Sequence, residues 1–145
     1  MIGLDTNVLL RYLAADDPVQ SPAARDLLEA RTADDPAYIS LVTLLETCWT
    51  LRSAFGRDRA AVNAVVGALA ALDEIVLQEP AAVAEALAVA EGWPADFPDA
   101  LVAVLGRRAG CGQTATFDRR AAAIPGMALV APAEPATGAG RPPGA

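Results

Sequence analysis

The stretch Ile2-Gly3-Leu4-Asp5-Thr6-Asn7-Val8-Leu9-Leu10 decides the fold, because within it a short apolar run passes directly into a helical pattern. Residues 1–4 predict a short buried strand, and residues 7–14 predict a helix with apolar side chains at helical spacing. Asp5 stands at the junction between them. Sites in open parallel sheets form where strands end and helices begin, so Asp5 is a candidate functional residue.

The rest of the chain repeats this alternation of short apolar strands and helices. Further strands are predicted at residues 38–40, 75–77, 113–116 and 128–130. Helices are predicted at residues 22–31, 41–54, 58–72, from Pro80 to the break at 92–94, and at 99–109, with a helical turn at 119–123. Short apolar strands alternating with helices are typical of an α/β fold with a parallel sheet.

The chain length of 145 residues favours one domain, predicted at residues 1–130. Residues 131–145 are rich in Pro, Gly and Ala and predict a disordered tail. Every apolar stretch is interrupted well before the ~20 residues that cross a bilayer. Since the start also lacks the pattern of a secretory signal, we expect a cytoplasmic protein without a membrane span.

Two absences restrict the chemistry. The chain has no histidine, and all 11 of its basic residues are arginine. Ribonucleases that work without a metal generally need His or Lys to move protons near neutral pH, so that mechanism is excluded. The two cysteines, Cys48 and Cys111, cannot complete a zinc site and are expected to be reduced and buried. Any metal should therefore be a hard cation with oxygen ligands.

Three further acids stand at junctions between elements. Asp96 and Asp99 bracket the start of the helix near residue 99, and Asp118 follows the strand that ends at Thr116. Each has a structural alternative, because Asp commonly caps the helix that follows it. Asp5 and Asp118 fit that role, and Asp96 with Asp99 resembles a capping pair. Capping is the favoured role of Asp96.

Glu46 is the acid that capping does not explain. It lies within the predicted helix 41–54, between Val42 and Trp49, and is expected to point along the apolar stripe. A carboxylate there is expensive to bury without a partner. An ion pair with Arg52 or Arg11 is the structural alternative. A shared role for four acids is metal binding, since Mg²⁺ takes carboxylate oxygens, water and substrate phosphate as ligands.

These motifs, in this order and spacing, resemble the PIN domains, and among them the VapC toxins of bacterial toxin–antitoxin pairs. The resemblance covers roughly residues 1–130. It rests on the opening stretch, on residues 39–46, on Asp96-Phe97-Pro98-Asp99-Ala100-Leu101-Val102-Ala103, and on Thr116-Phe117-Asp118. It implies a PIN-like (Rossmann-like) three-layer fold, with a short central parallel sheet flanked by helices.

The resemblance also implies site residues. The acidic constellation that binds the metal in the family corresponds to Asp5, Glu46, Asp99 and Asp118. The resemblance makes Asp96 an accessory acid. It also implies that Asn7 and Thr116 sit near the acids and orient them.

The activity implied by the resemblance is that of a Mg²⁺-dependent endoribonuclease, with Mn²⁺ as a substitute. Water activated by the metal would cut RNA and leave a 5′-phosphate and a 3′-hydroxyl. The expected partners are RNA, a VapB-like antitoxin and a second copy of the chain in a homodimer. Apolar side chains beyond the needs of a thin sheet modestly support the dimer, although the core is their favoured place: Leu27, Leu28, Val62, Val65, Val66 and Leu69.

The net charge of −7 argues against a nucleic-acid partner. Without the four acids proposed as metal ligands it would be −3, and a bound cation would cancel more. The principal candidates for phosphate contact are Arg52, Arg107, Arg119 and Arg120, and an ordinary solvated face is the alternative for each.

Two other classes of function are weighed against a nuclease. Phosphatases of the haloacid-dehalogenase type and phospho-receiver domains also place an Asp after the first strand, but they normally need a lysine, which this chain lacks. A catalytically silent PIN-like module that binds nucleic acid or another protein is the second alternative. Four intact acids count against it.

Overall fold

The computed structural model describes residues 1–133. The disordered tail predicted for residues 131–145 therefore falls mostly outside the described residues. The N-terminal half contains β1 (Ile2–Gly3), α1 (Thr6–Ala14), α2 (Gln20–Glu29), β2 (Ala37–Ile39), α3 (Leu41–Ser53) and α4 (Arg59–Ala70). The C-terminal half contains β3 (Ile75–Leu77), α5 (Pro80–Gly92), α6 (Phe97–Arg108), β4 (Thr114–Thr116), the 3₁₀ turn η1 (Ala121–Ala123) and β5 (Met127–Leu129).

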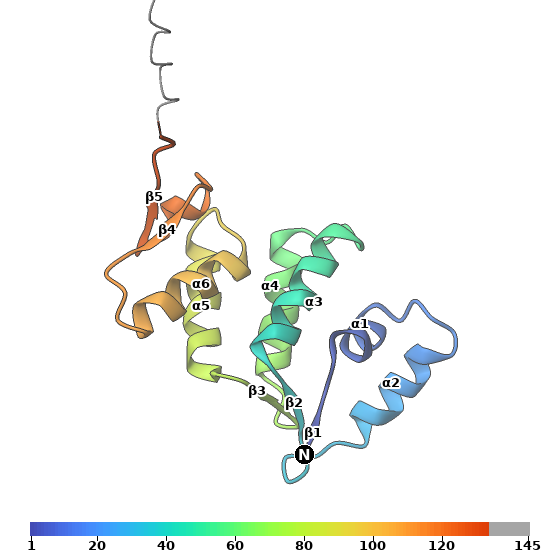
Figure 1. Cartoon of the computed structure of the whole chain (residues 1–145). Helices are drawn as coiled ribbons and strands as arrows, with labels where there is room; N and C mark the ends of the chain where they lie inside the picture. Colours follow the sequence, from blue (N-terminus) through green and yellow to red (C-terminus); the bar gives the residue numbers. More distant parts are fainter. Residues whose placement is uncertain (134–145) are drawn as a thin grey trace, which may run out of the picture.

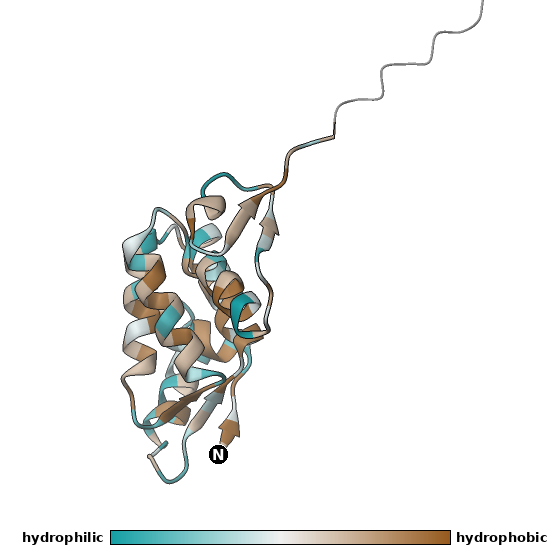
Figure 2. Ribbon diagram, turned by 90° about the vertical axis from the view of Figure 1, so that its left-hand side faces the viewer, coloured by the Kyte–Doolittle hydropathy of each residue, from teal (hydrophilic) through white to brown (hydrophobic). Residues whose placement is uncertain are grey.

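The strands pair in parallel, as the alternation of strands and helices predicts. They form two sheets: a three-stranded sheet in the order β1-β2-β3 and a two-stranded sheet of β4 and β5. The two sheets lie at opposite ends of the folded part, with helices between them (Figures 1 and 2). The α/β fold class is confirmed, and the parallel pairing is divided between two short sheets.

Close packing against α6 holds β4 in the second sheet. Gly106 of α6 faces Thr114 of β4, and a Cβ atom at Gly106 would collide with the Thr114 hydroxyl. Glycine therefore permits the approach of strand and helix. Asp118, just beyond β4, lines a pocket with Asp96 and Asp99 at the start of α6.

The strand β1 is more exposed than expected. Both of its residues are exposed, with Ile2 at 37%. The cause is topological, since β1 is an edge strand of the three-stranded sheet and pairs with β2 through Ala37 and Tyr38. Leu4, directly after the strand, is the residue of this segment that enters the core.

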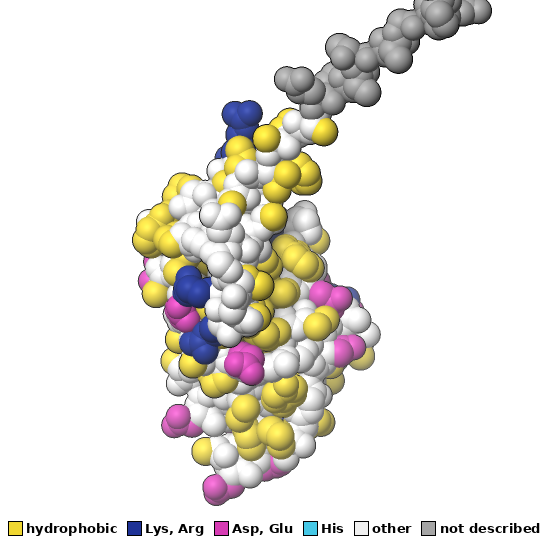
Figure 3. All heavy atoms as spheres, turned by 60° about the vertical axis from the view of Figure 1, so that its left-hand side comes forward, with side chains coloured by type: hydrophobic (Ala, Val, Ile, Leu, Met, Phe, Trp, Pro, Cys, Tyr) yellow, Lys and Arg dark blue, Asp and Glu magenta, His cyan; other side chains and the backbone are white. Residues whose placement is uncertain are grey.

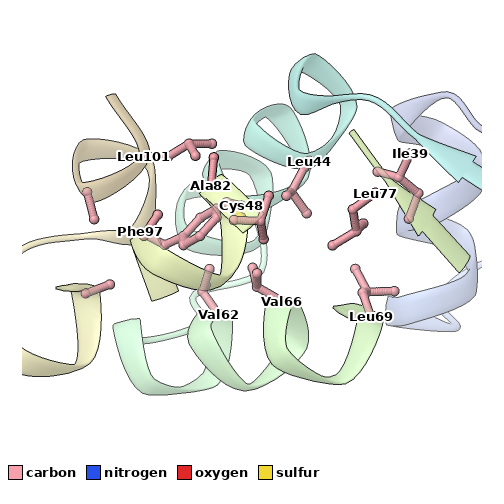
Figure 4. Packing of buried hydrophobic residues seen from close by; sticks show 14 of the residues in the cluster. Ile39, Leu44, Cys48, Val62, Val66, Leu69, Leu77, Ala82, Phe97 and Leu101 are labelled. Atoms are coloured by element: carbon pink, nitrogen blue, oxygen red, sulfur yellow. The ribbon is translucent and has the colours of Figure 1, made fainter. Parts of the chain in front are cut away.

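The core is one cluster of apolar side chains from the helices and the three-stranded sheet, and part of it, between α3, α4, α5 and α6, is shown in Figure 4. Figure 4 shows Cys48 of α3 near Phe97 of α6, with Val62 and Val66 of α4 facing them. Small side chains let α5 pack closely, since Ala82 and other alanines of this helix are fully buried. The apolar side chains considered for a dimer mostly serve this core: Leu28, Val62, Val66 and Leu69 are buried, while Leu27 and Val65 pack partly buried against it.

The two cysteines occupy different environments. Cys48 is buried, as expected, and burial raises the pKa of its thiol to about 12. Cys111 is exposed, so the expectation that it is buried was wrong. It lies in the connection after α6, where the chain turns at Gly110 with a positive φ of 92° and leaves the core. Within residues 1–133, no helix is long and apolar enough to cross a membrane.

Candidate functional site

Asp5 lies where β1 passes into α1. Its carboxylate accepts a hydrogen bond from the backbone N–H of Val8 at 3.0 Å, so it caps α1. The capping alternative is thus observed, and the side chain is also exposed to solvent. One oxygen, Oδ1, serves the cap. A carboxylate has about four lone-pair sites, so capping leaves acceptor capacity for a cation.

Glu46 is tied to this corner of the molecule. The Thr6 hydroxyl, at the first position of α1, donates a hydrogen bond to Glu46 Oε2 at 2.6 Å. The prediction that Glu46 points along the apolar stripe of its helix was wrong. Glu46 is exposed, and its neighbours Val42 and Trp49 are 67% and 58% exposed. The buried face of α3 is formed instead by Leu44, Cys48 and others, at positions one turn apart.

Glu46 also lacks the ion pairs considered for it. Arg11 binds both carboxylate oxygens of Asp16, at 2.9 and 3.0 Å, and Gln20 at 2.9 Å. Arg52 lies 3.6 Å from Asp96. The partner of Glu46 is therefore a neutral hydroxyl, Thr6, which leaves its negative charge uncompensated by arginine in the described part of the chain.

The acids of α6 and β4 form a second group. Asp96, Asp99 and Asp118 line one shallow pocket of about 60 Å³, together with Arg120. Partial burial raises the pKa of Asp99 above its ordinary value of 3.8, and the negative charges of Asp118 and Asp96 raise it further. The charges of Asp118 and Asp96 thus disfavour the ionised form of Asp99, and a cation placed among the three carboxylates would offset that repulsion.

Local hydrogen bonds fix Asp118. The hydroxyl of Thr116 accepts a hydrogen bond from the backbone N–H of Asp118 at 3.0 Å, and Asp118 Oδ1 accepts one from Arg120 N–H at 2.7 Å. Asp118 therefore caps the turn that leads into η1, as its structural alternative proposed. Thr116 thus contacts the backbone at Asp118 and not its carboxylate, and its role in orienting the acids stays a prediction.

Asp96 stands at the N-terminal cap position of α6, but its side chain makes no capping hydrogen bond. The favoured role of Asp96 as a side-chain cap was therefore wrong. The nearby guanidinium of Arg52 attracts its carboxylate instead, at 3.6 Å. This contact connects α3 with the start of α6.

The donor chemistry of these acids fits a hard divalent cation, because all five offer carboxylate oxygens. Their placement fits less well. Asp5 and Glu46 lie at the contact of α1 with α3, whereas Asp96, Asp99 and Asp118 line the pocket of about 60 Å³ at the start of α6. Among residues 1–133, no three Asp, Glu, Cys or His side chains gather closely enough to hold one metal ion. The four predicted ligands are thus presented as two groups.

Asn7 and Thr6 show what the sequence alone does not reveal. Asn7 lines an open groove of about 330 Å³ between α1 and α2 together with Asp5, and its neighbour Thr6 makes the hydrogen bond to Glu46. The one feature of the sequence that could have indicated a role for Thr6 in the site is its position directly after Asp5, at the first turn of the helix. A Thr there fits a cap equally well, so only the tertiary contact assigns it to Glu46.

The arginines proposed for RNA contact differ in their environments. Arg107 and Arg108 both bind Glu85 across α5 and α6, which lowers the pKa of Glu85 through their hydrogen bonds. Arg107 is therefore engaged by an acid. Arg119 and Arg120 are exposed beside Asp118. On the face shown in Figure 3, basic and acidic side chains lie near one another and do not form a broad basic patch.

Comparison with known proteins gives one match to a family. The sequence model of the PIN domain matches residues 2–127, which include all five acids of the candidate site. No curated protein sequence matches the chain. Among solved structures, it is similar to the Mycobacterium tuberculosis VapC20, a Sarcin-Ricin loop cleaving toxin, at 22% identity over 85% of this chain and 94% of that chain, with a TM-score of 0.42. A toxin–antitoxin complex from Klebsiella pneumoniae is similar at 22% identity over 92% and 98%, with a TM-score of 0.35.

Proposed function

The chain belongs to the PIN domain family, and from this premise we propose that it is a divalent-metal-dependent endoribonuclease that acts on RNA in the cytoplasm. PIN domain proteins are nucleases that generally use divalent metals, which supports the general class of reaction. The proposal goes further in naming Mg²⁺, with Mn²⁺ as a substitute, and RNA. The absence of His and Lys from the sequence supports a metal, since ribonucleases that work without a metal generally use those side chains to move protons near neutral pH.

The observation that carries the proposal is the group of acids around Asp99. The raised pKa of Asp99, caused by burial and by the charges of Asp118 and Asp96, is typical of functional sites in which like charges are held together. If these acids were only independent helix caps, their closeness to one another would have no explanation. A bound cation would explain it, because it stabilises the ionised carboxylates.

The proposed ligands are Asp5, Glu46, Asp99 and Asp118, with Asp96 as an accessory. When bound, the metal supplies activated water and neutralises charge on the scissile phosphate. Thr6 holds the carboxylate of Glu46 through its hydroxyl, so that one oxygen is fixed in direction. Thr116 fixes the backbone at Asp118.

Asp5 and Glu46 belong to one group, whereas Asp99 and Asp118 belong to the other. Coordination of a single ion by all four acids would require the two groups to approach each other. Alternatively, each group holds its own ion, as in sites that use two metals. In both cases water and the phosphate of the substrate would complete the coordination of the metal.

A cleavage assay tests the proposal. Purified protein is expected to cut single-stranded RNA with Mg²⁺ or Mn²⁺ and to be inactive in excess chelator. Glu46→Gln should abolish cleavage, whereas Glu85→Gln, which changes an acid engaged by Arg107 and Arg108, should leave cleavage unchanged. Cleavage that persists in chelator, or in Glu46→Gln, would contradict the proposed chemistry.

We further propose that the nuclease is the toxin of a toxin–antitoxin pair. In this proposal it forms a homodimer and binds a VapB-like antitoxin. The support is the resemblance of the motifs in this sequence to VapC toxins. The alternative is a catalytically silent module, for which the assay above would show no cleavage with any divalent ion. Co-expression with the adjacent open reading frame tests the toxin role, since the antitoxin should restore growth that the nuclease alone arrests.

A further inference from the structure

A small pocket adjoins the acids, and the proposed metal ligands do not explain it. It has a volume of about 70 Å³ and lies between α3, α4 and the start of α6. Asp96 lines both this pocket and the one that contains Asp99 and Asp118. The two pockets are thus neighbours on the surface. The side chains that matter for its chemistry are Trp49, Arg52, Arg59, Asn63 and Asp96.

Trp49 gives this pocket an aromatic wall. Its side chain is 58% exposed, whereas Leu44 and Leu51 of the same helix are buried. Such exposure forgoes the stabilisation that a buried Trp provides, which points to a binding role. Trp49 is one turn of α3 beyond Glu46, and it shares its pocket with Asp96.

Two arginines line the same pocket. Arg52 donates one hydrogen bond to the Arg57 carbonyl at 3.3 Å and lies 3.6 Å from Asp96, while Arg59 donates to the Ala95 carbonyl at 3.4 Å. Each guanidinium carries five N–H donors, so these contacts anchor the arginines and leave donors for a ligand. Planar guanidinium groups suit phosphate and also stack on aromatic faces.

Asn63 adds an unsatisfied acceptor. Its side-chain oxygen Oδ1 is buried and has no hydrogen-bond partner among residues 1–133. Asn63 also lines the neighbouring pocket formed by Arg59, Ala60 and Glu91. A buried acceptor without a partner destabilises the free protein, and rotation of the Asn63 amide toward a bound N–H donor would recover the hydrogen bond. The edge of a nucleobase carries such donors, whereas a phosphate or an aliphatic side chain does not.

We propose that Trp49 is the stacking platform for an unpaired base of the RNA next to the scissile phosphate, with Arg52 and Arg59 binding the adjoining phosphates. This inference rests on the proposed function, because it concerns the substrate of the same site. Single-stranded RNA is recognised by stacking on aromatic side chains and by contacts of arginine with the backbone. The pocket combines an aromatic ring, two arginines and a buried acceptor. This set suits single-stranded RNA better than it suits the apolar face of a partner's helix.

Binding of a fluorescein-labelled single-stranded oligoribonucleotide tests the inference, measured by anisotropy in chelator at low salt. Trp49→Leu should weaken binding at least about fivefold, the loss expected for one stacked base. Trp49→Phe should retain more affinity than Trp49→Leu, because it keeps an aromatic face. Trp93→Leu is the matched control, since Trp93 is 40% exposed but lies outside this pocket, and it should bind as the wild type does.

The same variants are then assayed for cleavage with Mg²⁺. Trp49→Leu should raise KM by a similar factor and change kcat less, because the residue positions RNA and does not touch the reacting atoms. Arg52→Gln should reduce the slope of log Kd against log salt by about one, the signature of one lost phosphate contact. Thermal melts of each variant establish that the fold is retained.

Several outcomes would overturn the inference while leaving the proposed function intact. One is a Trp49→Leu variant that binds and cleaves RNA like the wild type. Another is a variant with normal RNA affinity and an altered mass in analytical ultracentrifugation, which would assign this face to contact between copies. Equal losses in Trp49→Leu and Trp49→Phe would exclude stacking. A wild-type protein that neither binds nor cuts RNA would overturn both proposals.

Discussion

At the scale of single residues, Asp99 has the most informative environment. Its pKa is raised first by burial, and then by the charges of Asp118 and Asp96. A carboxylate that merely complemented the helix dipole at the start of α6 would be stabilised in its ionised form, which lowers the pKa. Burial and the charges of Asp118 and Asp96 act on the pKa of Asp99 in the opposite direction. The environment of Asp99 therefore suits a cation ligand better than a residue that only complements a helix dipole.

This direction predicts the pH dependence of the Asp99→Asn variant without metal. At pH 7 the variant should be at least as stable as the wild type, because it lacks a carboxylate that the folded state disfavours in its ionised form. The folded wild type binds this proton more tightly than the unfolded chain does, so the advantage of Asn is lost as the pH falls through the raised pKa of Asp99 toward 3.8. Urea unfolding in chelator at several pH values measures this difference in the free energy of unfolding between the variant and the wild type.

Three other acids have lowered pKa values: Asp17, Asp35 and Glu85. Their contributions to the pH dependence of stability cancel when the variant is compared with the wild type, because both proteins carry them. An Asp99→Asn variant that is less stable than the wild type, by a constant few tenths of a kcal/mol across this pH range, would indicate a helix-dipole role instead.

At the scale of elements, α3 connects the parts of the site. Ser40 caps its start by accepting a hydrogen bond from the Thr43 backbone N–H at 3.1 Å. The exposed face of α3 then presents Glu46 toward Thr6 of α1. Arg52, near its end, lies beside Asp96 at the start of α6. A single rigid helix thus sets the distance between the two groups of acids.

The contact between α1 and α3 predicts the effect of changing Thr6. Thr6→Val removes the donor to Glu46 while conserving the shape of the side chain, so kcat should fall, whereas Thr6→Ser keeps the hydroxyl and should retain most activity. The loss of stability should be at most about 0.5–1.5 kcal/mol, the usual net value of one hydrogen bond. Single-turnover cleavage and thermal melts measure the two effects. Equal activity of Thr6→Val and the wild type would show that Glu46 does not need this hydrogen bond.

At the scale of the whole molecule, the acids come from parts of the chain that only the fold connects. Asp5 follows β1 in the three-stranded sheet, and Asp118 follows β4 in the two-stranded sheet. The two sheets lie at opposite ends of the folded part (Figure 1). If both groups contribute to metal binding, the metal stabilises the whole domain and not one end of it.

Magnesium should therefore raise the stability of the wild type more than that of either Asp5→Asn or Asp99→Asn, because each variant loses one ligand of the proposed metal binding. A ligand that binds only the folded state stabilises it by about 2.7 kcal/mol at 100 times its Kd. Thermal melts with magnesium and with chelator measure the difference for each protein. Glu85→Gln is the control and should respond as the wild type does, since Glu85 binds Arg107 and Arg108. A full response in Asp5→Asn would restrict the metal to the second group.

The sequence by itself determined the alternation of elements and the junctions at which most of the acids stand. The predicted bounds agree with the structure to within a few residues, for example α3 at Leu41–Ser53 and β3 at Ile75–Leu77. This part of the fold is predictable because apolar periodicity, prolines and caps act over a few neighbouring residues. The motifs around Asp5, Glu46, Asp99 and Asp118 likewise indicated the family that the sequence model identifies.

Only the tertiary structure decided how these elements face one another. It divided the strands into two sheets, exposed Glu46 beside Trp49, paired Arg52 with Asp96, and left Cys111 in solvent. None of this follows from local periodicity, because a helix such as α3 has apolar residues on two faces and its hydrophobic pattern does not say which face meets the core. That choice depends on contacts between residues far apart in the sequence, such as the hydrogen bond from the Thr6 hydroxyl to Glu46.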